Sequence, residues 1–306
     1  MSEKIAIILA GGEGKRMKSG RPKVLSEVLF EPMIRWVMDA AREAGIDEIC
    51  VVTGSKKEYL EEYLGTLPFE VKTVFQPERL GTGHAVMMAE EFIGSHPGSD
   101  VLILNGDAPF IDAETITGAY DAQQTAGDDR GCTVITAELD DPFGYGRIVR
   151  SGGDELAAIV EEKEATDEIR AVREVNSGAY WFAADALRDA LKKLVPSEKT
   201  GELYLTDTIN IIRGSGLSVR AFKASNADSV LGANDCIQLA QLNEIARMRV
   251  LHQHMANGVN IPCTDGVIIG RHVKIGANAV ILPATVIRGN ADIASFEEIG
   301  PGACPA

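Results

Sequence analysis

The hydrophobic pattern of roughly the first hundred residues alternates between short apolar runs and longer amphipathic stretches. Runs of apolar or β-branched residues at 5–9, 49–53, 70–75 and 101–104 are typical of strands buried on both faces. Between the first two runs, residues 32–45 begin with a proline, carry apolar side chains at helical spacing and end at a glycine, which predicts a helix. This βαβ patterning predicts an α/β domain with a parallel sheet, in which ligands bind at the carboxyl ends of the strands.

The pattern changes further along the chain. Residues 85–92 resemble another helix, strands dominate from 132 to 182, and a long helix is expected over 234–257. Beyond it, isoleucine recurs at every sixth position, at 269, 275, 281, 287, 293 and 299. A period of six fits neither a helix nor a simple pleated strand, and it is the signature of a hexapeptide-repeat parallel β-helix. The alternative is a surface meander whose spacing is coincidental.

These patterns predict three parts: an α/β domain over 1–232, a connecting helix over 233–257 and a short β-helix over 258–306. With three hexapeptides to a coil, the repeat region would build only about two coils, whereas a solenoid needs several stacked units to bury a continuous core. The chain therefore looks like a truncated or abbreviated form of something longer.

Charge and cysteine content argue against several classes of protein. The formal net charge of −15 disfavours nucleic acid or an anionic membrane surface as a partner, because both reward a basic face. Five cysteines without a C-x-x-C spacing indicate neither a disulfide framework nor a zinc site. The N-terminal apolar run is one strand long and no cleavage site follows it, so we expect a cytoplasmic protein.

The first apolar run leads directly into a glycine-rich loop, Leu9-Ala-Gly-Gly-Glu-Gly-Lys-Arg-Met17. It is not a Walker A loop, and the dinucleotide fingerprint G-x-G-x-x-G fails because Met17 stands at its third glycine. Small residues nonetheless let backbone N–H groups approach an anion, and the nearby cations Arg16 and Lys23 can complete the cradle. The alternative is a flexible turn with solvated surface charges.

Two further segments carry candidate ligand-binding groups. Gly81-Thr82-Gly83-His84-Ala85 leads into the next expected helix; its glycines allow close backbone approach and Thr82 offers a hydroxyl. His84 is either a titrating group or a structural residue at a helix start. Asp107 follows the fourth apolar run, and one carboxylate plus substrate phosphates is a typical Mg²⁺ site. The alternative role for Asp107 is a helix cap or turn.

Polar motifs in the strand-rich half suit recognition of sugar hydroxyls by amide, carboxylate and backbone groups. They are Gly144-Tyr-Gly-Arg147, Val160-Glu-Glu-Lys163 and Val175-Asn-Ser-Gly178. Taken singly, these also fit a hairpin turn, a charged edge strand and a turn. No Ser/His/Asp triad can be argued and no G-x-S-x-G motif occurs, which suits direct displacement at phosphorus.

Together these motifs resemble one known family. The glycine-rich loop, Pro22-Lys-Val-Leu25, Gln76 with Leu80-Gly-Thr-Gly-His-Ala85, Gly106-Asp107, the three polar motifs and Gly232-Ala-Asn234 occur in the order expected of bacterial N-acetylglucosamine-1-phosphate uridylyltransferase. That enzyme is usually the N-terminal half of a bifunctional protein whose C-terminal half is a glucosamine-1-phosphate acetyltransferase. The resemblance spans essentially the whole chain. It implies a Rossmann-like nucleotidyltransferase domain with a mostly parallel mixed sheet, followed by the start of a left-handed parallel β-helix.

The resemblance also implies a role for each site residue. UTP would lie against Leu9, Ala10, Gly11, Gly12, Gln76, Gly81 and Thr82. The catalytic cations on the triphosphate would be Arg16 and Lys23, the Mg²⁺ ligands Asp107 and Asn234, and the amino-sugar ligands Gly146, Glu161 and Asn176. The sugar 1-phosphate oxygen would attack the α-phosphorus in line and expel pyrophosphate, while Mg²⁺ and the two cations absorb the developing charge.

Some features depart from the family. The coils that carry the acetyltransferase residues lie beyond this sequence, so we expect no acetyltransferase activity from it. The family trimer, built through the β-helix, would have a smaller interface here. Asn105 stands where relatives vary and is given no role. Two alternatives stay open: a nucleotidyltransferase for another sugar 1-phosphate, such as glucose 1-phosphate, and a non-catalytic assembly subunit of the same fold.

Overall fold

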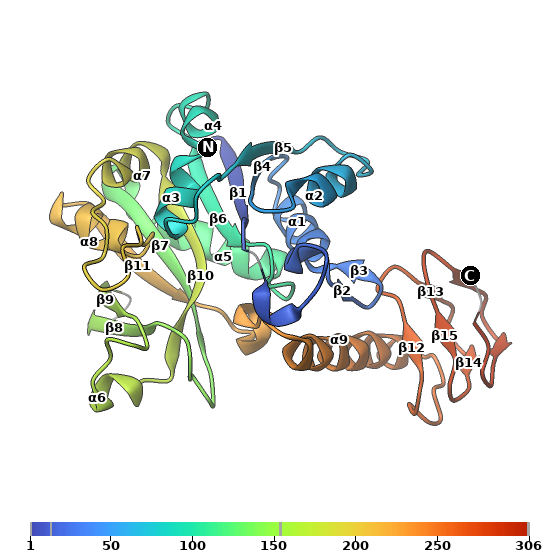
Figure 1. The fold of residues 1–306 in the computed structure, drawn as a ribbon. Helices are drawn as coiled ribbons and strands as arrows, with labels where there is room; N and C mark the ends of the chain where they lie inside the picture. Colours follow the sequence, from blue (N-terminus) through green and yellow to red (C-terminus); the bar gives the residue numbers. More distant parts are fainter. Residues whose placement is uncertain (1, 13, 153–154, 305–306) are drawn as a thin grey trace. The chain divides into compact units, whose positions relative to one another are not determined.

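The computed structural model describes residues 2–12, 14–152 and 155–304, and the chain divides into two compact units. The first unit comprises Met1–Leu25 and Met33–Gly232, and the second comprises Ser26–Pro32 and Ala233–Ala306. Figure 1 shows the elements of both units along the chain. A short N-terminal segment thus belongs to the same unit as the C-terminal repeats, which the sequence pattern did not suggest.

The first unit is built on a nine-stranded mixed sheet with the strand order β5-β4-β1-β6-β10-β7-β11-β9-β8. Its strands are β1 (Lys4–Ala10), β4 (Glu48–Thr53), β5 (Lys72–Phe75), β6 (Asp100–Asn105), β7 (Arg130–Glu138), β8 (Arg147–Gly152), β9 (Glu155–Val160), β10 (Glu174–Ala183) and β11 (Ser218–Lys223). The first four in this order pair in parallel, and β10 lies antiparallel between β6 and β7. The predicted α/β class is confirmed.

Helices cover both faces of this sheet. They are α1 (Met33–Glu43), α2 (Lys57–Leu64), α3 (Thr82–Met87), α4 (Glu90–Gly94), α5 (Ala113–Gln124), α6 (Asp167–Arg170), α7 (Ala184–Leu191) and α8 (Asp207–Gly214), with 3-10 turns η1 (Lys15–Met17), η2 (Lys23–Leu25), η3 (Gly127–Asp129) and η4 (Ala227–Val230). Ile7 of β1 packs in a core with α3, α4, α7 and α8, whereas Ile8 packs in a core with α1, α2 and α5. The central strands are apolar on both faces because each face is covered by helices.

Two sequence predictions were wrong in detail. The run at 70–75 was expected to be buried on both faces, but β5 is the outer strand of the sheet, and Lys72, Thr73 and Phe75 are exposed. The single helix expected over 85–92 is two short helices, α3 and α4, which are separated at Met88 and Ala89. An edge position and a helix break are set by neighbouring elements, so periodicity alone did not show them.

The second unit contains the long helix α9 (Cys236–Ala256) and a small hairpin of β2 (Glu27–Val28) and β3 (Glu31–Pro32). The Asp235 side chain caps α9 by accepting hydrogen bonds from two backbone N–H groups of its first turn. Asn243 of α9 accepts from Leu29 N at 3.0 Å and donates to Glu27 O at 3.0 Å. These hydrogen bonds hold the N-terminal hairpin against a helix that lies more than two hundred residues further along the sequence.

The predicted hexapeptide repeats form coils of a parallel β-helix. The strands are β12 (Ile268–Ile269), β13 (Lys274–Ile275), β14 (Val280–Ile281), β15 (Val286–Ile287), β16 (Asp292–Ile293) and β17 (Glu298–Ile299). Each strand pairs in parallel with the strand three hexapeptides away, as in Ile269 with Ile287. Ile269, Ile281 and Ile287 are fully buried, and the repeat prediction is confirmed.

Candidate active site

Two strand ends meet at one edge of the sheet and bring the glycine-rich loop beside Asp107. Leu9 of β1 lies in parallel register with Asn105 of β6, and Gly106 N donates to Leu9 O at 3.0 Å. Both strands end here, so the loop after Ala10 and the segment after Asn105 leave the sheet side by side. This is the carboxyl edge at which ligands of α/β sheets bind.

Gly11 lies at a point of close backbone approach. A Cβ added to Gly11 would lie 2.8 Å from Oε1 of Gln76, and a Cβ added to Gly54 would lie 2.3 Å from the Gly11 carbonyl oxygen. The end of β1 is therefore packed against the segments that follow β4 and β5. The structure brings Gly11 and Gln76, two of the predicted UTP-binding residues, into direct proximity.

Lys23 and Asp107 form an ion pair, although 84 residues separate them along the chain. Lys23 lies in η2, and its stem runs along the glycine-rich loop, since a Cβ added to Gly12 would lie 3.3 Å from Lys23 Cε. The side chains of Lys23 and Asp107 are 16% and 18% exposed, so both charges remain within reach of a ligand. Arg16 lies in η1 with its side chain exposed.

Gly232, the last residue of the first unit, lies close to Asp107 in space. A Cβ added to Gly232 would lie 3.0 Å from the Asp107 carbonyl oxygen, so only a glycine fits there comfortably. Asn234, the second predicted metal ligand, follows two residues later and belongs to the second unit. Its backbone N–H donates to Oε1 of Gln238 at 2.7 Å.

The block from Gln76 to His84 is held by a segment that sequence reasoning missed. A Cβ added to Gly81, whose φ is +107°, would lie 2.4 Å from the Leu203 carbonyl oxygen. Gly83 N donates to that oxygen at 2.8 Å, and Leu205 N donates to Oγ1 of Thr82 at 3.0 Å. The Thr82 hydroxyl still has its own proton to donate. Leu203 and Leu205 lie in the segment between α7 and α8, and isolated apolar residues carry no chemical signal, so they could not be identified from the sequence.

The three predicted sugar-binding residues cluster where β8, β9 and β10 adjoin. Asn176 N donates to Gly146 O at 2.9 Å. A Cβ added to Gly146 would lie 3.7 Å from Asn176 Cβ and 3.7 Å from Glu161 Oε1. Gly146 immediately precedes β8, Glu161 immediately follows β9, and Asn176 lies at a bulge in β10. The Asn176 amide is fixed on both sides, because Nδ2 donates to Tyr180 Oη at 2.7 Å and Oδ1 accepts from Gly178 N at 3.1 Å.

Burial and negative charge shape the electrostatics of this cluster. Burial raises the pKa of Glu161, and the nearby carboxylates of Glu164 and Asp207 raise it further. Burial also raises the pKa of Tyr145, with an added contribution from the charge on Asp107. The charge of Asp107 is therefore felt at Tyr145, the residue next to Gly146.

The Nucleotidyl transferase family model matches residues 5–228, which cover most of the chain. The chain belongs to the nucleotidyl transferase family. It is 43% identical over 301 residues to the bifunctional protein GlmU of Caldanaerobacter subterraneus subsp. tengcongensis, and 43% identical over 298 residues to that of Acetivibrio thermocellus. These matches cover 98% and 97% of this chain but only 64% and 63% of the relatives, so the chain spans about two thirds of their length at most.

A solved structure shows the same nucleotidyl transferase fold. It is a crystal structure of a Bacillus anthracis protein named for glucose-1-phosphate thymidylyltransferase activity, with a TM-score of 0.66 and 23% identity. The match covers 80% of this chain and 95% of that one. At this identity the likeness concerns the fold alone.

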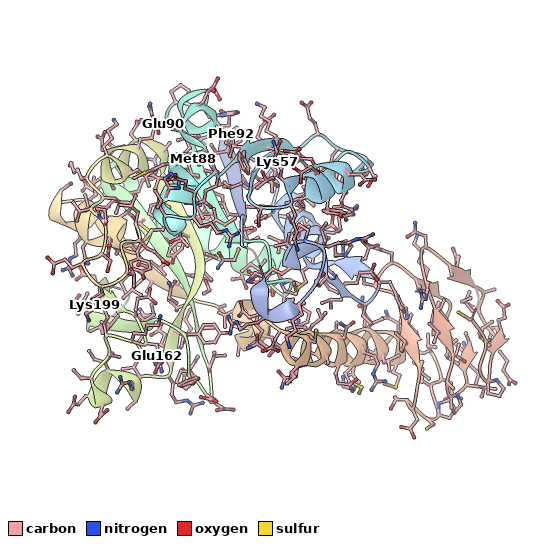
Figure 2. All side chains as sticks on the ribbon, viewed as in Figure 1. Lys57, Met88, Glu90, Phe92, Glu162 and Lys199 are labelled. Carbon is pink, nitrogen blue, oxygen red and sulfur yellow. The ribbon has the colours of Figure 1, made fainter. Side chains whose placement is uncertain are left out.

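Two further side chains, Glu162 and Tyr180, hold the segments that carry the predicted sugar-binding residues. Glu162 pairs with the buried Arg147 at 2.7 Å and accepts from Gly144 N at 3.3 Å, so it holds the loop that carries Gly146 (Figure 2). Tyr180 is buried and holds Asn176. The sequence analysis included Glu162 in the motif Val160-Glu-Glu-Lys163 but gave it no role. It did not identify Tyr180, because nothing distinguishes this residue from others in an apolar strand.

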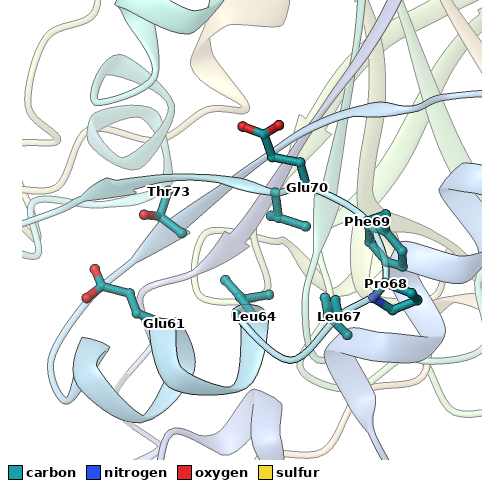
Figure 3. Close-up of a pocket in the computed structure, with 9 residues that line it drawn as sticks. Glu61, Leu64, Leu67, Pro68, Phe69, Glu70 and Thr73 are labelled. Carbon is teal, nitrogen blue, oxygen red and sulfur yellow. The ribbon is translucent and has the colours of Figure 1, made fainter.

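Two other features of the nucleotidyl transferase lie outside this arrangement. A surface hollow between α2 and β5 is lined by Glu61, Leu64, Phe69, Glu70 and Thr73 among others (Figure 3). None of the described residues that line it is a predicted site residue. Within the described ranges, no three His, Cys, Asp or Glu side chains are grouped as a metal site, and no helix has the length and hydrophobicity to cross a membrane.

Proposed function

We propose that this chain transfers the uridylyl group of UTP to N-acetylglucosamine 1-phosphate, giving UDP-N-acetylglucosamine and pyrophosphate. The observation that carries the proposal is the ion pair of Lys23 and Asp107, which joins the glycine-rich loop to the end of β6. Phosphoryl-group chemistry of this kind needs positioning and charge neutralisation more than a protein nucleophile. Membership of the nucleotidyl transferase family and the similarity to GlmU proteins support the same reaction class.

Different residues of the first unit would bind different parts of the two substrates. We propose that the backbone of residues 9–12, with Gln76, Gly81 and Thr82, binds the nucleoside, and that Lys23 and Arg16 bind the triphosphate. The polar cluster of Gly146, Glu161 and Asn176 would bind the amino sugar, because it presents a carboxylate and an oriented amide. An oxygen of the sugar 1-phosphate would form a bond to the α-phosphorus as the bond to the β-phosphate oxygen breaks. Lys23 would stabilise the charge that develops on the leaving pyrophosphate.

The family implies a divalent metal, and we propose Mg²⁺. The donor chemistry fits, since Asp107 offers a partly exposed carboxylate, and Mg²⁺ is commonly held by one or two carboxylates with substrate phosphates and waters. Asp107 and Asn234 would hold the ion. When bound, Mg²⁺ would neutralise phosphate charge and orient the phosphates for displacement. We also propose a cytoplasmic location, from the cysteine content and the N-terminal sequence, and a homo-oligomeric state, from the resemblance.

The proposal is tested by pyrophosphate release from purified protein with UTP and Mg²⁺, comparing N-acetylglucosamine 1-phosphate with glucose 1-phosphate. We expect a strong preference for the N-acetylated sugar. Asp107→Ala should lower kcat/KM by roughly a hundredfold or more, as loss of a transition-state charge contact does. Asp128→Ala, which removes an exposed carboxylate outside the site, is the matched control.

Other outcomes select the alternatives. Equal or better turnover of glucose 1-phosphate would assign another sugar 1-phosphate as the substrate. A folded protein that releases no pyrophosphate with either sugar would contradict the proposal and favour the non-catalytic assembly subunit.

A further inference from the structure

His84 contacts the buried amide of Gln76, and the two side chains form a small hydrogen-bonded unit beside the glycine-rich loop. Gln76 is only 6% exposed. Its Nε2 atom lies 3.2 Å from the Gly81 carbonyl oxygen and 3.2 Å from His84 Nδ1. Its Oε1 atom lies on the opposite side, 2.8 Å from the position of a Cβ added to Gly11.

The Gly81 carbonyl determines which way the amide points. A carbonyl oxygen can only accept a hydrogen bond, so the Gln76 atom facing it must be the NH₂ group. The opposite orientation would set two oxygens against each other at 3.2 Å. Gly81 is itself held, because Leu203 N donates to Leu80 O at 2.6 Å and Gly83 N donates to Leu203 O at 2.8 Å.

The amide orientation in turn determines the state of His84. One Nε2 proton of Gln76 goes to Gly81 O, which leaves the second for His84 Nδ1. His84 must therefore accept at Nδ1 and carry its proton on Nε2. Both donors of Gln76 are used within the protein, and Oε1, a pure acceptor, is presented towards Gly11.

We propose that His84 is a positioning residue for base selection: together with the Gly81 carbonyl it occupies both N–H donors of the Gln76 amide, so that an acceptor, and not a donor, faces the nucleotide base. An acceptor at this point favours a pyrimidine whose ring N3 carries a proton, as in uracil, over cytosine, whose N3 is itself an acceptor. The inference rests on the proposed function, because it assumes that the base lies beside Gly11 and Gln76. It adds a residue, His84, that acts through Gln76 and to which the proposed function gives no role.

The test compares His84→Leu, which removes the acceptor at nearly the same volume, with His84→Asn, whose side-chain oxygen can lie near the Nδ1 position. For each protein we would measure kcat/KM for UTP and for CTP, and KM for the sugar 1-phosphate. For His84→Leu we expect roughly a tenfold fall in the UTP-to-CTP ratio, because a site built on hydrogen bonds discriminates through them. His84→Asn should recover most of the ratio, and KM for the sugar 1-phosphate should be unchanged in both.

Thermal unfolding of each variant separates misfolding from loss of selectivity, and His252→Leu, at an exposed position of α9, controls for the substitution itself. A His84→Leu protein that keeps the wild-type UTP-to-CTP ratio within twofold would overturn the inference. An equal fall of the UTP-to-CTP ratio in the Leu and Asn variants would also overturn the inference, because a hydrogen-bond acceptor at position 84 would then make no difference. If the wild-type protein turns over neither UTP nor CTP, the proposed function itself is contradicted. This is measured on the wild-type protein alone, so it is distinguished from a failure of the inference about His84.

Discussion

Single side chains in this site have definite partners, and those partners make their roles testable. Lys23 lies against both the glycine-rich loop and Asp107, so its ammonium group is held beside the loop that we propose binds the phosphates. A flexible surface lysine would have neither constraint. The contribution of Lys23 should therefore appear in turnover and not only in stability.

We predict that Lys23→Ala lowers kcat/KM for pyrophosphate release by roughly a hundred- to a thousandfold, because one oriented charge is lost from the transition state. Lys23→Arg should recover only part of this, since the planar guanidinium cannot occupy the position of a compact ammonium. Steady-state kinetics would measure both. Lys193→Ala, an exposed lysine after α7, should match wild type; comparable activity of Lys23→Ala would contradict the role.

We expect the ionised carboxylate of Glu161, which serves the proposed sugar binding, to lower the free energy of unfolding at neutral pH. Burial raises its pKa above the usual value, so the folded protein holds the proton more tightly than the unfolded chain does. As pH rises from the unfolded to the folded pKa, the unfolded state binds fewer protons and stability falls; above that window the penalty is constant. The main cause is the desolvated charge, which the positive charge of Lys163 offsets only in part.

We predict that Glu161→Gln raises the Tm at pH 7 relative to wild type, while it lowers activity with the sugar 1-phosphate at least tenfold. The gain in Tm should shrink towards zero as pH is lowered to about 4, below the ordinary glutamate pKa. Calorimetry across pH, paired with kinetics, measures both effects. A Glu161→Gln protein with a lower Tm at pH 7 would show that the carboxylate is stabilising.

At the scale of elements, α9 holds a hairpin that the sequence pattern did not connect to it. Asn243 accepts from Leu29 N and donates to Glu27 O and to Leu239 O, at 3.0, 3.0 and 3.1 Å. Leu29 and Phe30 have positive φ angles, so this segment depends on outside contacts to keep its conformation. The Phe30 ring also lies under the Arg288 guanidinium of the β-helix, at 4.4 Å.

We predict that Asn243→Ala destabilises the second unit by about 1–3 kcal/mol, because the backbone groups of the hairpin lose their partners. Amide hydrogen exchange at Leu29 should accelerate more than exchange in the core of β1. Gln253→Ala, an exposed position on the same helix, should leave both unchanged. Unaltered exchange at Leu29 in the Asn243 variant would mean that the hairpin is held by packing alone.

At the scale of the whole molecule, the two units have separate cores. Ile5, Ile7 and Ile8 anchor the sheet of the first unit, and Ile269, Ile281 and Ile287 stack within the coils of the second. Proteins with distinct cores often unfold in more than one transition. Each core should then respond to its own substitutions.

We predict that Ile287→Ala lowers one calorimetric transition, with a cost of about 2–5 kcal/mol for the cavity it leaves. Val52→Ala, in the fully buried part of β4, should lower the other transition. A single transition that both substitutions shift equally would show that the units unfold as one.

Periodicity determined much of the fold. Strands β1, β4 and β6, the helix α1 and the eighteen-residue coil were predictable because apolar spacing reports directly on which faces are buried. Periodicity did not predict that β5 is an exposed edge strand or that the helix is broken between α3 and α4. Whether an adjacent element is present determines both features.

The residue types of the site were also determined by the sequence and its resemblance to a family: glycines where backbones crowd, a lysine, a carboxylate and an amide. Only the tertiary structure decided which of them meet. Lys23 pairs with Asp107, Gln76 contacts His84 and turns its oxygen towards Gly11, and Tyr180 holds Asn176. These partners are far apart or unremarkable along the chain, and a hydrogen bond depends on distance in space, which local sequence does not encode.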